Sequence, residues 1–251
     1  VSYLEGPTAR IVSGCTNPNT KLVSWIHIEQ HTKELASKSF RSYKEALDCY
    51  SKFDRTVCVS DTVKDDFESI FDTKKPVEVL YNTNESEKIK KLSDEKVDDV
   101  DFSKDTINII SVAKIVPSKG YDRLMKIHKK LIEENIKSHI YILGIGEEKE
   151  KYEKYLTENN LTDTFTFLGY RDNPYKYVKK ADLYVCSSRR EGFSTAVTEA
   201  LIVGTPVVST NCSGAYELLG KNNEYGIVTD NNEDALYEGI KKMLTTPDLL
   251  E

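Results

Sequence analysis

Short runs of β-branched and apolar residues alternate with amphipathic stretches from residue 106 to the end of the sequence. The runs predict buried strands at Thr106–Ala113, His139–Leu143, Thr164–Leu168, Leu183–Ser187, Pro206–Ser209 and Tyr225–Val228. The amphipathic stretches predict helices at Asp122–Glu134, Glu147–Asn159, Pro174–Lys180, Ser194–Val203 and Asn232–Leu244. This alternation with short loops predicts an α/β domain with a parallel, doubly wound sheet, which binds ligands at the carboxyl ends of its strands.

Residues 1–84 follow a less complete pattern. Apolar runs predict strands at Leu22–Ile28, Thr56–Ser60 and Val77–Tyr81, and a long helix is expected from Thr32 to Phe53. These residues fall short of the roughly 150 that a domain of this class usually has. The sequence also has no initiating Met and no opening strand–helix–strand unit. We therefore expect a partial N-terminal domain at 1–84.

Residues 85–105, a charged stretch without a clear periodicity of apolar residues, separate the two regions. Its few apolar residues predict an exposed linker between domains. The expected organisation is therefore a partial domain at 1–84, a linker at 85–105 and a C-terminal ligand-binding domain at 106–251.

Composition narrows the class of protein. The 251 residues carry a formal net charge of −6, which argues against a nucleic-acid partner, and no apolar run is long enough to span a membrane. The five cysteines show no metal-binding or redox spacing and favour a reduced, cytoplasmic protein. His27 and His31, four residues apart, could hold a metal on one helix face, but no third ligand is apparent, so no metal site is expected.

The segment EGFSTAVTEALIVGTPVVST, residues 191–210, contains the most informative chemistry. Glu191 lies ahead of a predicted helix and Glu199 inside it, so both carboxylates can face the crevice at the strand ends. The intervening residues offer backbone amides without intrahelical partners: Gly192, Phe193, Ser194 and Thr195. Such amides favour phosphate and carboxylates accept hydrogen bonds from sugar hydroxyls, which together indicate a nucleotide sugar. The alternative is a solvated helix face, although Glu199 is followed by apolar residues.

Two lysines follow the first strand of the C-terminal region. Lys114 and Lys119 stand at its carboxyl end, where two ammonium groups could neutralise a diphosphate without a metal ion. The alternative is a pair of ordinary surface lysines.

Two glycine-containing loops follow the next strands. Gly144-Ile145-Gly146 resembles a fragment of a dinucleotide fingerprint but lacks the third glycine, so a tight turn is the better interpretation. Gly169-Tyr170-Arg171 lies where a base could rest, and Arg171 could pair with phosphate or form a structural salt bridge.

Taken in order, these motifs resemble the group 1 (family four) retaining glycosyltransferases of the GT-B fold. The resemblance runs from about Leu22 to Leu244. It rests on VAKIVPSKGYDRL, LGYRDNPYKYVKKADLYVCSS, EGFSTAVTEAL and GTPVVST, and in the front region on WIH, VCVSDTVKDDF and VEVLYNT. It implies two Rossmann-like domains with parallel sheets, the first of them incomplete in this chain.

The resemblance implies roles for single residues. Lys119 matches the lysine that grips the donor diphosphate, and Lys114 stands where most members have arginine. Glu191 and Glu199 match the two glutamates of the Glu-x7-Glu motif, the first directed at the donor sugar and the second at the ribose hydroxyls. His27 resembles a histidine near the reaction centre, while a buried structural histidine stays an open alternative. The implied donor-binding residues are Gly169, Tyr170, Arg171, Gly192, Phe193, Ser194, Thr195, Ala196 and Glu199.

The implied activity is transfer of a hexose, with retention, from a nucleoside diphosphate sugar to a hydroxyl group. A UDP-sugar is the first expectation for the donor and a glycan or lipid-linked molecule for the acceptor, with neither cofactor nor metal, in the synthesis of capsular or other surface polysaccharide. A nucleotide-sugar epimerase of the same fold and a non-catalytic partner subunit stay open as alternatives. The helix predicted from Thr32 to Phe53 carries basic residues that could also lie against anionic lipid at the inner face of the membrane: Lys33, Lys38, Arg41 and Lys44.

Overall fold

The structure is a computed structural model that describes residues 1–246 and 249–250. The chain forms two compact units, one of Val1–Thr83 with Glu191–Phe193 and one of Asn84–Arg190 with Ser194–Glu251.

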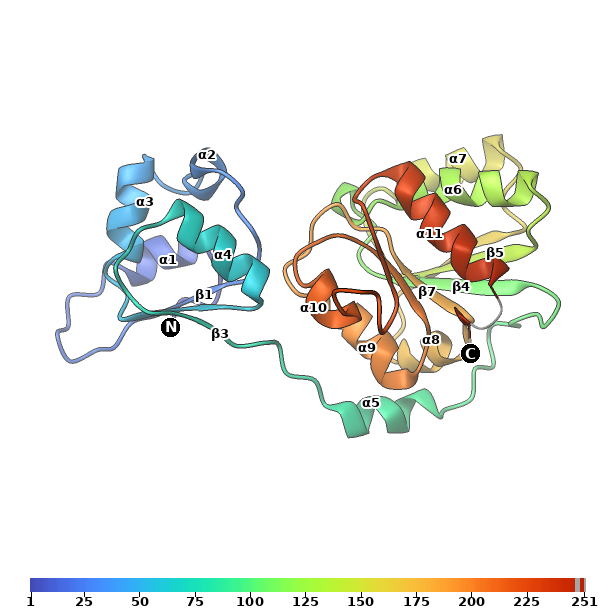
Figure 1. Ribbon diagram of the computed structural model, residues 1–251, viewed down its shortest axis with the longest axis horizontal. Helices are drawn as coiled ribbons and strands as arrows, with labels where there is room; N and C mark the ends of the chain where they lie inside the picture. The colour runs from blue at the N-terminus through green and yellow to red at the C-terminus, as the bar shows by residue number, and fades with distance from the viewer. Residues whose placement is uncertain (247–248, 251) are drawn as a thin grey trace. The chain divides into compact units, whose positions relative to one another are not determined.

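The first unit has a parallel sheet of three strands, β1 (Val23–Ile26), β2 (Arg55–Cys58) and β3 (Val77–Val79), in the order β1-β2-β3. Its helices are α1 (Pro7–Val12), α2 (Lys33–Ala36), α3 (Tyr43–Tyr50) and α4 (Asp61–Ile70). Helices α1, α3 and α4 lie on the same side of this sheet (Figure 1). The core between them is rich in aromatic rings, with Tyr50, Phe53 and Phe67 each almost fully buried. The three predicted strands are confirmed, whereas α1 and α4 were not expected.

The prediction of one long helix from Thr32 to Phe53 is wrong. The chain forms two short helices here because Ser42 caps a new one: its hydroxyl accepts the N–H of Glu45 at 3.2 Å. The Glu45 carboxylate in turn accepts the N–H of Arg41 at 2.5 Å, which fixes the preceding turn. The four basic residues are therefore divided among α2, the turn and α3 instead of lining one helix. No helix among the described residues has the length and apolar character needed to cross a membrane.

The second unit has a parallel sheet of six strands, in the order β6-β5-β4-β7-β8-β9. The strands are β4 (Ile107–Val112), β5 (Ser138–Leu143), β6 (Phe165–Gly169), β7 (Leu183–Cys186), β8 (Val207–Thr210) and β9 (Ile227–Thr229). The chain adds β5 and β6 on one side of β4 and then β7, β8 and β9 on the other. Ile109 pairs with Leu183 where the order reverses, between β4 and β7. All six predicted strands are confirmed.

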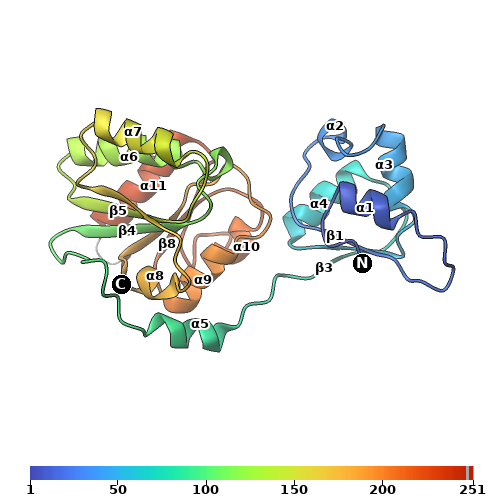
Figure 2. The ribbon, with the colours of Figure 1, turned by 180° about the vertical axis from the view of Figure 1, so that it is seen from behind.

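Helices cover both faces of this sheet. Alternate strand residues point to opposite faces, so Ile109 packs into one core cluster and Ile110 into another. Helices α6 (Tyr121–Glu133), α7 (Lys149–Glu158) and α11 (Glu233–Thr245) lie on the first face, and α8 (Tyr175–Lys180), α9 (Thr195–Val203) and α10 (Ala215–Leu219) lie on the opposite one (Figures 1 and 2). The doubly wound α/β prediction is confirmed, and α10 is an addition to it.

The stretch predicted as an exposed linker instead packs on the second unit. It contains α5 (Ser86–Ser93), which contacts α8 and α9 and buries Ile89. After α5, the chain stays attached: the Asn173 amide donates to the Leu92 carbonyl at 2.8 Å, and Lys179 pairs with Asp94 at 2.5 Å. The charged composition misled the prediction because a few widely spaced apolar side chains are enough to hold this segment in place.

Candidate functional site

The site lies at the carboxyl ends of β4 and β7, where the strand order of the second sheet reverses. In doubly wound sheets the loops leaving such neighbouring strands diverge and open a crevice for ligands. The loop after β4 carries Lys114 and Lys119, the latter in a short 3-10 helix, η1 (Pro117–Lys119). The loop after β7 leads to Ser194 at the start of α9. The topology therefore brings these predicted site residues to the same sheet edge.

A buried arginine holds the loop after β7. Arg123 on α6 is only 4% exposed, and its guanidinium donates to the carbonyl oxygens of Ser187 (Nε, 2.8 Å) and Ser188 (Nη2, 2.6 Å). Its remaining nitrogen donates to the Asn231 side chain at 2.9 Å. Burial lowers the pKa of Arg123 from its ordinary value. Sequence reasoning missed this residue, although a charged side chain among the apolar positions of an amphipathic helix was a usable signal.

A second arginine ties the two loops together. Arg189, after β7, forms a two-pronged ion pair with Asp122 of α6, with both N–O distances at 2.7 Å. Its backbone N–H donates to the Ser118 carbonyl of the loop after β4, also at 2.7 Å. The Arg189 guanidinium lowers the pKa of the Asp122 carboxyl. An ion pair with two parallel hydrogen bonds fixes direction as well as distance. The Arg189–Asp122 pair therefore sets the geometry of the β4 loop beside Lys119.

Glycine allows the same loops to approach closely. Gly120 has φ of +69°, and a Cβ atom there would lie 2.1 Å from the Ser187 carbonyl oxygen. At Gly144, with φ of +149°, a Cβ would lie 1.9 Å from the Ala113 carbonyl oxygen. The Gly144-Ile145-Gly146 segment thus packs the β5 loop against the β4 loop, in agreement with the tight-turn interpretation.

A cavity of about 450 Å³ opens at this edge of the sheet. Lys114 is exposed within its lining, and the ring of Tyr170, 66% exposed, stands at it. The structure thus brings together residues from three separate predicted motifs. The lining residues are Val112, Ala113, Lys114, Leu143, Gly144, Ile145, Tyr170, Arg171, Asp172, Pro174 and Tyr175.

Arg171 also lines this cavity, but its charge is already paired. Its Nη2 lies 2.9 Å from Asp99 Oδ2, and its Nε donates to the Tyr177 hydroxyl at 3.2 Å. The sequence left two roles open for Arg171, a contact with phosphate or a structural salt bridge, and the structure shows the salt bridge. The pair also connects the cavity wall to the chain that follows α5.

The start of α9 and its second turn provide the remaining donor-site candidates of this unit. Ser194 caps the helix by accepting the Val197 N–H at 3.3 Å, while the amides of Thr195 and Ala196 belong to the first turn, which lacks intrahelical acceptors. Glu199 is partly buried, and burial raises the pKa of its carboxyl. The side chain of Tyr175, one of the cavity residues, acts in the opposite direction and favours a lower pKa of this carboxyl.

The other predicted site residues group with the first unit. Glu191, Gly192 and Phe193 lie between β7 and α9 but cluster with Val1–Thr83. His27 follows directly after β1, and its ring meets the Tyr3 ring edge-on with centroids 4.8 Å apart. The His27 N–H donates to the Glu5 carboxylate at 3.0 Å.

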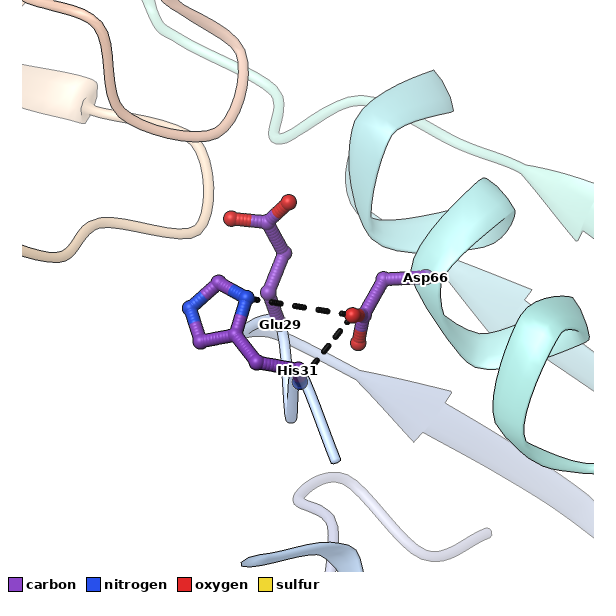
Figure 3. Close-up of side chains that lie close together, drawn as sticks. All are labelled: Glu29, His31 and Asp66. Atoms are coloured by element: carbon purple, nitrogen blue, oxygen red, sulfur yellow. Dashed lines mark hydrogen bonds and ion pairs between the residues drawn. The ribbon is translucent and has the colours of Figure 1, made fainter. Parts of the chain in front are cut away.

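The expectation for His27 and His31 needs correction, because the two residues do not share a helix. His31 lies in the loop after β1, with φ of +60°, beside Asp66 of α4 (Figure 3). Candidate ligand atoms of Glu29, His31 and Asp66 lie within 4.8 Å of one another. The Asp66 oxygens already accept the backbone N–H groups of Gln30 (2.6 Å) and His31 (3.0 Å). These contacts make Asp66 the anchor of the loop that follows His27.

Comparison with known proteins identifies the family. The model of the family described as "Glycosyl transferases group 1" matches residues 93–251. The chain belongs to the group 1 glycosyltransferases. The six-stranded sheet with its switch-point loops is the part of the chain that the match covers, and the GT-B fold prediction is confirmed by solved structures.

Two curated relatives and one solved structure are similar to this chain. An uncharacterized glycosyltransferase of Methanocaldococcus jannaschii is 31% identical over 209 residues, which are 80% of this chain and 51% of the relative. The N-acetylgalactosamine-N,N'-diacetylbacillosaminyl-diphospho-undecaprenol 4-alpha-N-acetylgalactosaminyltransferase of Campylobacter jejuni is 29% identical over 94% of this chain and 60% of its own. A TarM variant of S. aureus, in complex with fondaparinux, alpha-GlcNAc-glycerol and UDP, has a TM-score of 0.71 at 18% identity. That match covers 94% of this chain and 46% of TarM. The chain thus spans about half to three-fifths of these proteins.

Proposed function

We propose that the second unit binds a nucleoside diphosphate sugar, a UDP-sugar first of all, at the carboxyl edge of its sheet. We further propose that the protein transfers the hexose, with retention, to a hydroxyl group of a glycan or a lipid-linked acceptor. The observation that carries this proposal is the cavity at the carboxyl ends of β4, β5 and β6, which has Lys114 in its lining and Lys119 and the α9 N-terminus on the same sheet edge.

The proposed catalysis is mainly electrostatic. When the bond between the anomeric carbon and the diphosphate breaks, negative charge develops on the diphosphate oxygens. Lys114, Lys119 and the first-turn amides of α9 stabilise this charge, and each such donor typically lowers the barrier by about 3 kcal/mol. Lys114 acts as a point charge, since an ammonium group lacks the two-pronged geometry of the arginine found in most members.

The remaining contacts select the donor. The exposed Tyr170 ring offers a face on which the base can stack, and Glu199 accepts hydrogen bonds from the ribose hydroxyls. Gly169 supplies the turn that presents Tyr170, with φ of +74°. Glu191 and the amides from Phe193 to Ala196 are assigned to the donor sugar and its phosphates.

Retention is assigned to front-side attack. Among the described residues that line the cavity, Asp172 has the one carboxylate. It lies in the loop after β6, with the residues assigned to the base, and is therefore not assigned as a nucleophile. The acceptor hydroxyl then attacks from the side that the diphosphate leaves, and the diphosphate oxygen takes its proton. His27, beside the acceptor-side sheet, is the candidate to orient that hydroxyl.

Two similarities support the choice of substrates. The Campylobacter relative is named for an acceptor linked to diphospho-undecaprenol, and the TarM complex contains UDP. A lipid-linked acceptor places the reaction at the cytoplasmic face of a membrane, with the protein bound there peripherally, in the synthesis of a surface polysaccharide. The net charge of −6 gives no support to a nucleic-acid partner.

The test combines binding and product analysis on the full chain. Calorimetric titration with UDP, GDP and ADP identifies the base, and UDP binding that Glu199→Ala abolishes is the expected result. Incubation with UDP-hexoses, with and without lipid-linked glycan acceptors, then identifies the reaction. A new sugar nucleotide formed from donor alone would indicate an epimerase, and nucleotide binding by none of the three would contradict the donor site.

A further inference from the structure

The short 3-10 helix η1, which carries Lys119, is held by the loop after β7 at each of its three carbonyl groups. The Arg189 guanidinium donates to the Pro117 carbonyl oxygen at 2.8 Å, and the Arg189 backbone N–H donates to the Ser118 carbonyl oxygen at 2.7 Å. The Ser187 hydroxyl donates to the Lys119 carbonyl oxygen, also at 2.8 Å. The backbone that carries the Lys119 side chain is therefore fixed by residues about 70 positions further along the sequence.

Arg189 is itself held in place by two other elements. Its guanidinium pairs with Asp122 at the start of α6, with both N–O distances at 2.7 Å. The Asn231 side chain, in the loop before α11, donates to the Arg189 carbonyl oxygen at 3.0 Å and accepts from the buried Arg123 at 2.9 Å. Arg189 thus has a defined position relative to α6 and β7, and its contacts with η1 give Lys119 a defined position in turn.

We propose that Arg189 is a positioning residue for Lys119, which holds η1 in the conformation that receives the diphosphate of the donor. The proposal rests on the proposed function, in which Lys119 binds that diphosphate. A backbone that already has its bound conformation does not have to be ordered when the ligand arrives, so the ligand binds more tightly. The family resemblance implies no role for Arg189.

The exposure of the Arg189–Asp122 pair separates this role from a role in stability. The two side chains are 43% and 37% exposed, and ion pairs at such positions contribute little to the free energy of unfolding. The two-pronged geometry nevertheless fixes the direction of the guanidinium, and with it the contact to the Pro117 carbonyl. Because both terminal nitrogens of Arg189 already donate within the protein, the phosphate is assigned to Lys119 and not to Arg189.

The experiment compares UDP titrations of the full chain with those of Lys119→Ala, Arg189→Ala and the double variant. Lys119→Ala is expected to weaken UDP binding about tenfold or more, the usual effect of losing one hydrogen bond to a charged group. Arg189→Ala is expected to weaken it about fivefold, because the lysine stays but its backbone is no longer fixed. Arg55→Ala is the matched control and should bind as the parent protein does, since Arg55 pairs with Glu78 in the first unit at 2.6 Å and is 52% exposed.

A double-mutant cycle separates positioning from direct contact. If Arg189 acts through Lys119, adding Arg189→Ala to Lys119→Ala weakens UDP binding by less than about twofold. Uridine, which lacks the diphosphate, should bind to Arg189→Ala and to the parent protein equally. About fivefold losses of UDP binding in both backgrounds, a parallel loss for uridine, or parental UDP binding by Arg189→Ala would overturn the positioning role while the donor site stands. Absence of UDP binding by the parent protein would overturn both.

Discussion

Arg123 and Ser187 are joined twice, because both Nε and Nη2 of one buried guanidinium donate to the same carbonyl oxygen, at the point where β7 ends. The arginine belongs to α6, so this contact fixes the exit of β7 to the helix that follows β4. One buried charged group of α6 therefore holds the loop after β7, and Arg189 joins that loop to the loop after β4.

Replacement of Arg123 is expected to destabilise the second unit strongly. Arg123→Ala leaves the carbonyl groups of Ser187 and Ser188 buried without this donor, which typically costs about 3 kcal/mol or more of the free energy of unfolding. Denaturant unfolding of the variant measures the change. Lys126→Ala is the matched control, since this lysine lies on the same helix with a side chain 52% exposed and pairs with Glu233 at 3.5 Å. Equal stability of the two variants would contradict the anchoring role.

The second sheet could be predicted from sequence because its strands are buried on both faces. Runs such as residues 107–112 are then rich in β-branched apolar residues, and the loops after them identify the ligand edge. Topology alone also sufficed to place Lys114 and Tyr170 at one cavity. Contacts between residues far apart in the sequence were not predictable: the Arg123 side chain with the Ser187 carbonyl, and Arg189 with Asp122, join residues 64 and 67 positions apart and follow no local pattern.

Local competition explains the errors in the first unit and the linker. The stretch from Thr32 to Phe53 has helical periodicity, yet Ser42 and Glu45 form a cap inside it, and a satisfied cap outweighs weak helix propensity. Residues 85–105 were predicted to be an exposed linker because most of them are charged or polar. Ile89 of α5 is nevertheless buried, since one apolar position per helical turn is enough to pack a short helix on a neighbouring surface.

A pair of glycine variants tests the close approach of the two loops. Gly120 and Gly204 both have left-handed backbone, with φ of +69° and +82°. An added Cβ at Gly204 meets nothing within 4 Å, so Gly204→Ala is expected to cost only the backbone strain of about 1–2 kcal/mol. At Gly120 the new atom would overlap the Ser187 carbonyl oxygen, so Gly120→Ala should also displace the β4 loop and weaken UDP binding at least tenfold. Thermal unfolding and UDP titration measure both effects, and identical behaviour of the two variants would argue against the packing role.

Lys119→Ala is expected to lower the rate of hexose transfer by about two orders of magnitude, the usual effect of removing one donor to a developing anion. Lys114→Arg should retain activity, because arginine keeps the positive charge and adds two-pronged geometry. Steady-state rates with UDP-hexose and acceptor provide the measurement. Lys154→Ala, on the exposed side of α7 with a side chain 77% exposed, is the control. Near-parental turnover by Lys119→Ala would refute its assignment to the diphosphate.

Glu199 is expected to show opposite effects on stability and on binding. Burial raises the pKa of its carboxyl in the folded protein, so the ionised form present at neutral pH is disfavoured by folding. Glu199→Gln should therefore raise the Tm at pH 7 while it weakens UDP binding. The gain in Tm should vanish as the pH falls below the ordinary glutamate pKa of about 4.3, because the carboxyl is then protonated in both the folded and the unfolded state.

UDP binding by the parent protein should decline on acidification as Glu199 takes up its proton, at a higher pH than an exposed glutamate would give. Unfolding curves and UDP titrations across this pH range test both parts. Glu158→Gln, at a side chain 59% exposed on α7, should change neither quantity. A Tm gain in Glu199→Gln that persists unchanged at low pH would show that the carboxylate is not penalised by burial, and its role in the donor site would have to rest on geometry alone.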